Sequence, residues 1–319
     1  MKAVVEKADG YSVLGKPISI IIEQEADVAC DSMKAVFVDS EDLKDIRKIY
    51  MLDDDVFDIE NALNSGEVLF SGVVDEIITD ISRSGSFVTV YARSLACLLT
   101  DSECSMMTYR DPSFGVLAER HGKPFGLSVC SCNPKTRKGS LSVKKGSSHY
   151  KVIQRFCREF MGTVLRVDHK GVIRHDLFSN GNHICFDNNS GIPFGRITIS
   201  ENRYSIISRI DVYDENGYCM SVDNPDAVKS GISRIRCLNL PESATQSVGD
   251  ADRIIKQSND KSFSVRLECL DCLVNSLGYA ASVNIPLCKD RKLYVVKVKY
   301  TYDNKGERTE IWLASRGDR

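Results

Sequence analysis

Residues 73–94 read VVDEIITDISRSGSFVTVYARS. β-Branched and aromatic residues are interspersed with polar ones on both sides of a central Ser-Gly, a pattern typical of two antiparallel strands joined by a tight turn. A very similar stretch, YVVKVKYTYDNKGERTEIWLAS, fills residues 294–315. The sequence therefore predicts that this chain forms the same β-hairpin twice.

A shift of 221 residues, which takes Gly85 to Gly306, aligns the two predicted hairpins. Any two hairpins with one buried face share a period of two, so alternation alone does not establish a repeat. Here the turn position, the strand lengths and the closing aromatic also coincide. The shift pairs Val74 with Val295, Ile77 with Val298, Thr79 with Tyr300, Ile81 with Tyr302, Val90 with Ile311, Tyr91 with Trp312 and Ser94 with Ser315. Strand-like segments precede both hairpins, so we predict two related β modules.

Helical patterns lie mainly between the two modules. The segment DPSFGVLAERHG has Asp111 as a candidate N-cap and Gly122 as a candidate helix end. The segment SSHYKVIQRFCREFMG, residues 147–162, has Ser147 or Ser148 as a candidate cap, an apolar face and a closing glycine. A third, short helix is expected after Asp250, in DADRIIKQ.

These patterns predict a mainly β fold with an α/β insertion. We expect a β-rich domain at residues 1–107, a small mixed α/β lobe at 108–180 and a second β-rich region at 181–319. With 42% hydrophobic and 27% charged residues, the 319-residue chain has the composition of a globular protein.

Charge and hydropathy exclude several functional classes. The chain has 42 basic and 44 acidic residues and a net charge of -2, so we expect no specific nucleic-acid recognition. No apolar run approaches the roughly 18 residues of a membrane helix, so we expect no stable membrane insertion. Glu6, Lys7 and Asp9 interrupt the N-terminal segment where a signal peptide needs apolar residues, which predicts that the chain is cytoplasmic when made. The 12 cysteines are then expected as free thiols.

Candidate metal ligands do not have ligand spacing. Cys269 and Cys272 form a lone pair, and positions three apart on a strand point to opposite faces. A second group lies within seventeen positions but matches no zinc pattern. It comprises His169, His175, His183 and Cys185. We therefore predict no metal, no cofactor and no metal-binding residues.

Catalytic candidates have simpler explanations as well. Cys157 could be paired with His149 or His121, but it lies on the apolar helix face, which favours packing. The run Asp53–Asp55 and a basic run are expected to be solvated loops. The basic residues are Lys135, Arg137, Lys138, Lys144 and Lys145. No phosphate loop, hydrolase elbow or metalloprotease motif occurs, so we predict no catalytic residues and no enzyme activity.

The first hairpin and its flanks also carry a family resemblance. GEVLFSGVVDEIITDISRSGSFVTVYARSLACLLTDSE, residues 66–103, resembles the N-terminal signature of the baseplate hub proteins of contractile phage tails. That group includes the phage Mu hub and the late control protein D family. The matching positions are Phe70, Ser71, Gly72, Arg93, Ser94, Leu98, Leu99 and Asp101. The helix and hairpin of 147–174, the DADRIIKQ helix and the closing hairpin resemble later parts of the family in the same order.

The resemblance implies two related tube-like β-barrel domains, one in each β-rich region, and a peripheral α/β lobe. It implies a homotrimeric, pseudo-sixfold ring that joins the tail tube protein to the central spike protein, surrounded by other baseplate proteins. Such a protein would be assembled into the tail baseplate of a phage or phage-tail-like particle. Tyr91 and Trp312 are then candidate aromatics of the repeat and of a subunit interface. A tail-associated cell-wall-degrading enzyme and a carbohydrate-binding β module remain the alternatives.

Overall fold

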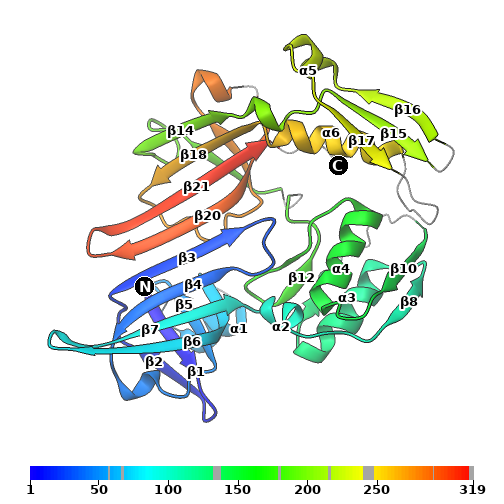
Figure 1. The fold of residues 1–319 in the computed structure, drawn as a ribbon. Coiled ribbons are helices and arrows are strands. Elements are labelled where there is room, and N and C mark those ends of the chain that lie inside the picture. The colour runs from blue at the N-terminus through cyan, green and yellow to red at the C-terminus, as the bar shows by residue number, and fades with distance from the viewer. Residues whose placement is uncertain are drawn as a thin grey trace. The chain divides into compact units, whose positions relative to one another are not determined.

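A computed structural model describes residues 1–56, 58–65, 68–131, 138–178, 181–214, 217–239, 248–289 and 291–315 (Figure 1). The chain divides into two compact units. Unit 1 comprises Met1–Asn180, Cys269–Gly278 and Lys297–Glu310, and unit 2 comprises Gly181–Glu268, Tyr279–Val296 and Ile311–Arg319. Both strands of the C-terminal hairpin, β20 (Leu293–Asp303) and β21 (Gly306–Ser315), supply residues to both units.

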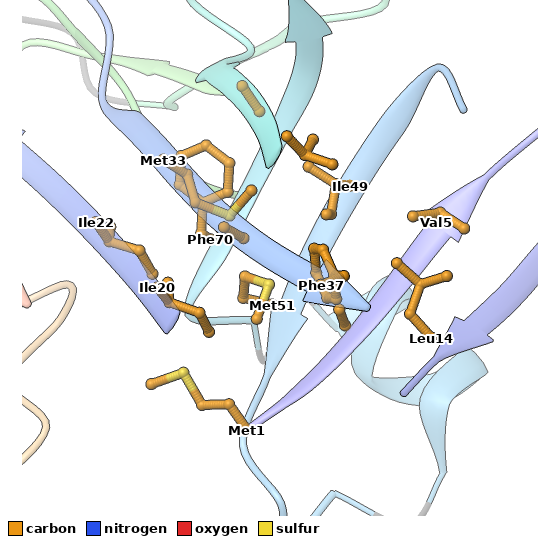
Figure 2. Packing of buried hydrophobic residues seen from close by; sticks show 14 of the residues in the cluster. Met1, Val5, Leu14, Ile20, Ile22, Met33, Phe37, Ile49, Met51 and Phe70 are labelled. Carbon is orange, nitrogen blue, oxygen red and sulfur yellow. The ribbon is translucent and has the colours of Figure 1, made fainter. Parts of the chain in front are cut away.

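Unit 1 contains an antiparallel sheet with the strand order β20-β3-β4-β7-β6-β5-β1-β2 (Figure 1). Its other strands are β1 (Lys2–Glu6), β2 (Tyr11–Leu14), β3 (Ser19–Glu25), β4 (Ser32–Val38), β5 (Lys48–Leu52), β6 (Phe70–Ser82) and β7 (Gly85–Ser94), and α1 (Ile59–Ser65) precedes β6. Alternate strand residues point inward, and Figure 2 shows Ile20, Met33, Phe37, Met51 and Phe70 packing together in this core.

The mainly β fold is confirmed. The two ends of the unit 1 strand path, β20 and β2, are not paired with each other in the described part of the chain. The sheet is therefore open there, and the closed tube-like barrel that the resemblance implies is not found among those strands.

The α/β lobe of unit 1 has its own apolar core. It contains α2 (Cys97–Thr100), α3 (Phe114–Gly122), α4 (His149–Phe156), the π-helical turn Cys157–Met161, the pair β8 (Met107–Arg110) and β10 (Ser140–Val143), and the small sheet of β9 (Ser128–Val129), β11 (Arg166–Val167) and β12 (Val172–Arg174). Its core also includes Ala96 and Leu99, which precede residue 108. The proposed domain boundaries at 107 and 180 stay predictions.

The helix ends of the lobe show which local signals operate. Ser148 caps α4 as expected, and Gly162, with φ of 68°, follows the π turn. The predicted cap of α3 was wrong, because the side chain of Ser113 accepts the Val116 N–H instead. Asp111 has a φ of 43° and its carboxylate accepts the Gly139 N–H at 2.8 Å, so it orders the start of β10.

Unit 2 combines two sheet regions. One has the order β14-β18-β21-β20, with β19 pairing β20 and β13. The other has the order β16-β15-β17 and packs on α6 (Val248–Asp260) through Ile210, Val212, Ala251 and Ile255. The elements are β13 (His183–Phe186), β14 (Arg196–Glu201), β15 (Arg209–Asp214), β16 (Gly217–Asp223), α5 (Pro225–Lys229), β17 (Ile235–Asn239), β18 (Phe263–Cys269) and β19 (Ala280–Val283). No helix within the described residues is long and apolar enough to cross a membrane.

Candidate functional site

The repeated hairpins coincide residue by residue in their second strands. β7 and β21 have the same bounds after the 221-residue shift, and both begin with a glycine of positive φ, 130° at Gly85 and 99° at Gly306. An L side chain rarely adopts such a φ, which explains why both turns use glycine. The inward positions also correspond: Val88 with Thr309, Val90 with Ile311, and Ala92 with Leu313 are all buried.

Each hairpin also has a cation over its closing aromatic ring. Lys34 Nζ on β4 lies 5.4 Å from the ring centre of Tyr91, and Arg266 Cζ on β18 lies 5.3 Å from that of Trp312. Both aromatic side chains are half-buried. The two sites are cation–π pairs made by equivalent strands, which extends the repeat beyond the hairpins. An interface role for Tyr91 and Trp312 stays a prediction.

The first strands of the hairpins differ in what covers them. β6 pairs with β5 only through Phe70–Val73, and its later residues pair with β7 alone among the described strands. Ile81 is 78% exposed there, although it lies on the same face as buried Val88. In β20, by contrast, Val298 and Tyr300 are fully buried.

The signature residues of the resemblance join the sheet of unit 1 to the lobe. Ser71 Oγ donates to the His169 carbonyl oxygen at 2.6 Å. Gly72 leaves no room for a Cβ, which would lie 2.5 Å from the Arg93 carbonyl oxygen and 2.7 Å from the Phe70 ring. These short residues let the β6–β7 backbone and the lobe approach each other closely.

Arg93 binds two carboxylates at the base of the first hairpin. Its guanidinium donates to Asp75 at 2.6 and 2.9 Å and to Asp101 at 3.1 and 2.7 Å. These bonds raise the pKa of Arg93, and the Arg93 hydrogen bond is the main cause that lowers the pKa of Asp101. The signature Arg and Asp therefore have a structural role.

A buried polar network, which the sequence did not predict, holds the lobe to β3 and β4. Arg166 of β11 forms a buried salt bridge with Asp31 and donates to the carbonyl oxygens of Glu25 and Val28. Gln24 Nε2 donates to Asp31 at 3.2 Å. A buried charge requires a partner, so this pair fixes the lobe against one end of the sheet.

The catalytic candidates do not have the properties of an active site. Burial raises the pKa of the Cys157 thiol to about 12, which suppresses the nucleophilic thiolate. His121 Nδ1 lies 2.9 Å from His149 Nδ1, and the Tyr109 hydroxyl lies 3.1 Å from His121 Nε2. Burial lowers the pKa of His121 to about 4, with the charge of His149 as the next cause. The three rings form a neutral hydrogen-bonded chain inside the lobe.

The candidate metal and charge clusters are also dispersed. Over the described ranges, no three His, Cys, Asp or Glu side chains are placed to hold a metal ion. The exposed Asp54 forms salt bridges with the N-terminal amine of Met1 at 2.6 Å and with Lys16 at 3.6 Å. Lys138, Lys144 and Lys145 are exposed beside β10, whereas Lys135 and Arg137 lie outside the described residues.

Comparison with known proteins gives a match in structure. No family model and no curated protein matches the sequence. A tail protein from Neisseria meningitidis MC58 matches with a TM-score of 0.73 and 13% identity, over 98% of this chain and 96% of that one. The 43 kDa tail protein of prophage MuSo2 from Shewanella oneidensis matches with a TM-score of 0.69 and 14% identity, over 99% and 98%.

A third match is a type VI secretion component from E. coli that itself has structural similarity to bacteriophage T4 tail proteins. Its TM-score is 0.55 at 10% identity, over 95% of this chain and 74% of that one. The matches to the two tail proteins extend over almost the whole of both chains, so they include the repeated hairpins as well as the lobe. The chain therefore has the fold of phage and prophage tail proteins, which confirms the resemblance at the level of fold.

Proposed function

We propose that this protein is a structural baseplate hub of a contractile tail. In this role three copies form a pseudo-sixfold ring that joins the tail tube to the central spike. The observation that carries the proposal is the duplicated hairpin, whose second strands have the same bounds after the shift and which has a cation–π pair in each copy, inside a fold shared with tail proteins.

Symmetry explains why such a chain would contain a duplication. Closed rings of identical chains present one copy of each surface per subunit, so a trimer offers three equivalent contacts. Two similar modules in each chain raise that number to about six. A trimer can then contact a threefold spike on one side and a sixfold tube on the other.

The role is structural rather than catalytic. The thiol and the histidines that could support nucleophilic chemistry are used in packing and in a neutral hydrogen-bonded chain. The partners are the tail tube protein, the central spike protein and the surrounding baseplate proteins, with assembly in the tail of a phage or phage-tail-like particle.

Assembled particles provide the direct test. Electron microscopy of tails carrying a tagged copy of this chain is expected to show three copies at the junction of tube and spike. Purified chain is expected to leave peptidoglycan intact. A monomer that clears peptidoglycan would favour the cell-wall enzyme, and any copy number other than three at the junction would refute the trimeric hub.

A further inference from the structure

Over the distal part of β6, the outer edge of the first hairpin pairs with no described strand. From Glu76 to Ser82, this strand pairs with β7 on one side, and no other described strand pairs with it. Ile77 is 39% exposed and Ile81 is 78% exposed, although both lie on the face that packs into the core elsewhere in the hairpin. Open apolar strand edges are templates for pairing with another chain.

The second hairpin shows what covers the equivalent edge. The 221-residue shift takes residues 76–81 of β6 to residues 297–302 of β20. Those residues pair antiparallel with β3, with Lys297 opposite Glu25 and Tyr302 opposite Ile20. In the second hairpin, the edge equivalent to the outer edge of β6 is therefore paired with β3.

β14 is the counterpart of β3 in unit 2. The two cation–π pairs make Lys34 of β4 the equivalent of Arg266 of β18 in the repeat, which corresponds to a shift of 232 residues. Ile21 of β3 lies opposite Lys34, and Thr198 of β14 lies opposite Arg266. β14 also has one edge that no described strand occupies, since it pairs with β18 alone.

We propose that β6 of one copy pairs antiparallel with β14 of a second copy. Transferring the β20–β3 register gives Ile81 opposite Ile197, Thr79 opposite Ile199 and Asp80 opposite Thr198. Ile77 and Ile81 then share one face with Ile197 and Ile199, whereas Ile78 lies on the other face with Asp80. Arg196, whose side chain is 70% exposed, falls opposite Ser82 and beside Asp80. This placement of opposite charges resembles the Lys297–Glu25 and Lys299–Glu23 salt bridges between β20 and β3.

The inference rests on the proposed ring and identifies the strands that would join its subunits. Disulfide formation between two singly substituted chains tests the register. Asp80→Cys and Thr198→Cys proteins are mixed, concentrated and oxidised, and the linked peptides are identified by mass spectrometry. Directly opposite residues lie within disulfide reach, so the 80–198 link is expected.

The matched control combines Asp80→Cys with Ser200→Cys, two residues out of register. Diagonal neighbours lie about 7–8 Å apart, so this link is expected at no more than about a tenth of the yield. Equal yields, or no 80–198 link, would overturn the edge pairing. A trimer without the 80–198 disulfide would support the proposed ring and refute the β6–β14 pairing. Open chains of linked copies would support the pairing and refute the ring.

A second comparison needs no disulfide. Ile81→Lys places a charge on the proposed edge, and Val116→Lys makes the same change at an exposed valine of α3. Ile81→Lys is expected to weaken self-association at least about tenfold at an unchanged melting temperature, and Val116→Lys to leave it unaltered. Equal effects of the two, or particle cross-links from residue 80 to another tail protein instead of residue 198, would refute the inference.

Discussion

The two hairpins have the same turn and the same second strand, but different neighbouring strands. Their second strands coincide in length, in turn glycine and in buried positions. Their first strands differ, because β20 has β3 along its outer edge while the distal part of β6 has no partner strand among the described residues. Tyr300 is consequently fully buried and its counterpart Thr79 is exposed.

This difference separates two kinds of conservation within a repeat. The inward residues of the second strands stay buried in both modules, even where Val88 is replaced by Thr309. Residues on the outer edge change with what lies beside them: Tyr300 lies on a strand that pairs with β3 and is buried, whereas Ile81 lies where the outer edge of β6 pairs with no described strand and is 78% exposed.

Truncation at the paired positions is the largest test of this comparison. Tyr300→Ala removes a large buried side chain and is expected to lower the free energy of unfolding by about 3–5 kcal/mol. Thr79→Ala, at the equivalent exposed position, is expected to change it by less than about 0.5 kcal/mol. Denaturant unfolding of both variants measures the difference. Similar losses would mean that the two strands are equally covered.

Low pH is expected to destabilise the lobe more than either hairpin. Burial and the charge of His149 hold the pKa of His121 at about 4, below the unfolded value of about 6.5. The unfolded chain therefore binds more protons as the pH falls from about 6.5 to 4, and the stability conferred by the neutral pair is lost across that range. We expect a loss of about 2–3 kcal/mol.

Histidine NMR and unfolding at several pH values check this expectation. His121→Gln should reduce the pH dependence in this range, and the remainder should come from His149 and His175, whose pKa values are also lowered by burial. Neither hairpin has a histidine on its buried face, so hydrogen exchange in β7 and β21 should change less than exchange in α3. If β7 became unprotected at the same pH as α3, the first hairpin and the lobe would unfold as one unit.

The ion pair of Arg93 tests a feature that only the first hairpin has. The 221-residue shift takes Asp75 and Arg93 to Val296 and Ala314, so the second hairpin lacks this pair. Arg93→Ala is expected to cost about 1 kcal/mol at pH 7, since the pair is partly exposed. Arg83→Ala, at the turn of the same hairpin, is the control and should cost less.

The pH dependence of the Arg93 effect has a defined sign. The pKa of Asp101 is lowered, chiefly by its hydrogen bond to Arg93. Its contribution is therefore complete above the unfolded value of about 3.9 and is lost as the pH falls through the lower folded value. The difference in free energy of unfolding between wild type and Arg93→Ala should decrease below about pH 4. A gap that widens there would exclude this pairing.

Local features of the molecule could be predicted from the sequence. Both hairpins, their turn glycines and the Ser148 cap depend on residues close together in the chain, and such signals are readable as patterns. The N-cap of α3 was predicted at Asp111, but this carboxylate accepts from the Gly139 N–H instead. The sequence does not distinguish these two roles of an aspartate before a helix. The resemblance to tail baseplate hubs also gave the correct fold, since it combines four segments in the same order along the chain.

Long-range contacts could not be predicted. Asp31 and Arg166 lie 135 positions apart, and an arginine in a strand pattern normally reads as exposed. Gln24 and Asn275 lie 251 positions apart and bond to each other in unit 1. Which edges of β6 and β14 lie beside no described strand depends on strand order, which alternation does not determine.

The smallest expected effect concerns the two cation–π pairs, and it is the most direct measure of how alike the modules are. Double-mutant cycles with Lys34→Met and Tyr91→Leu, and with Arg266→Met and Trp312→Leu, isolate each interaction from the other contacts of its residues. We expect coupling free energies of about 0.5 kcal/mol for the first pair and about 1 kcal/mol for the second. Trp312 should give the larger value because the indole face binds cations best and the guanidinium stacks on it. Lys34→Met with Trp312→Leu, which joins residues of different pairs, should show no coupling. If only one pair were coupled, the equivalence of β4 with β18 would lose its energetic support, and the register inferred between β6 and β14 would lose one of its two anchors.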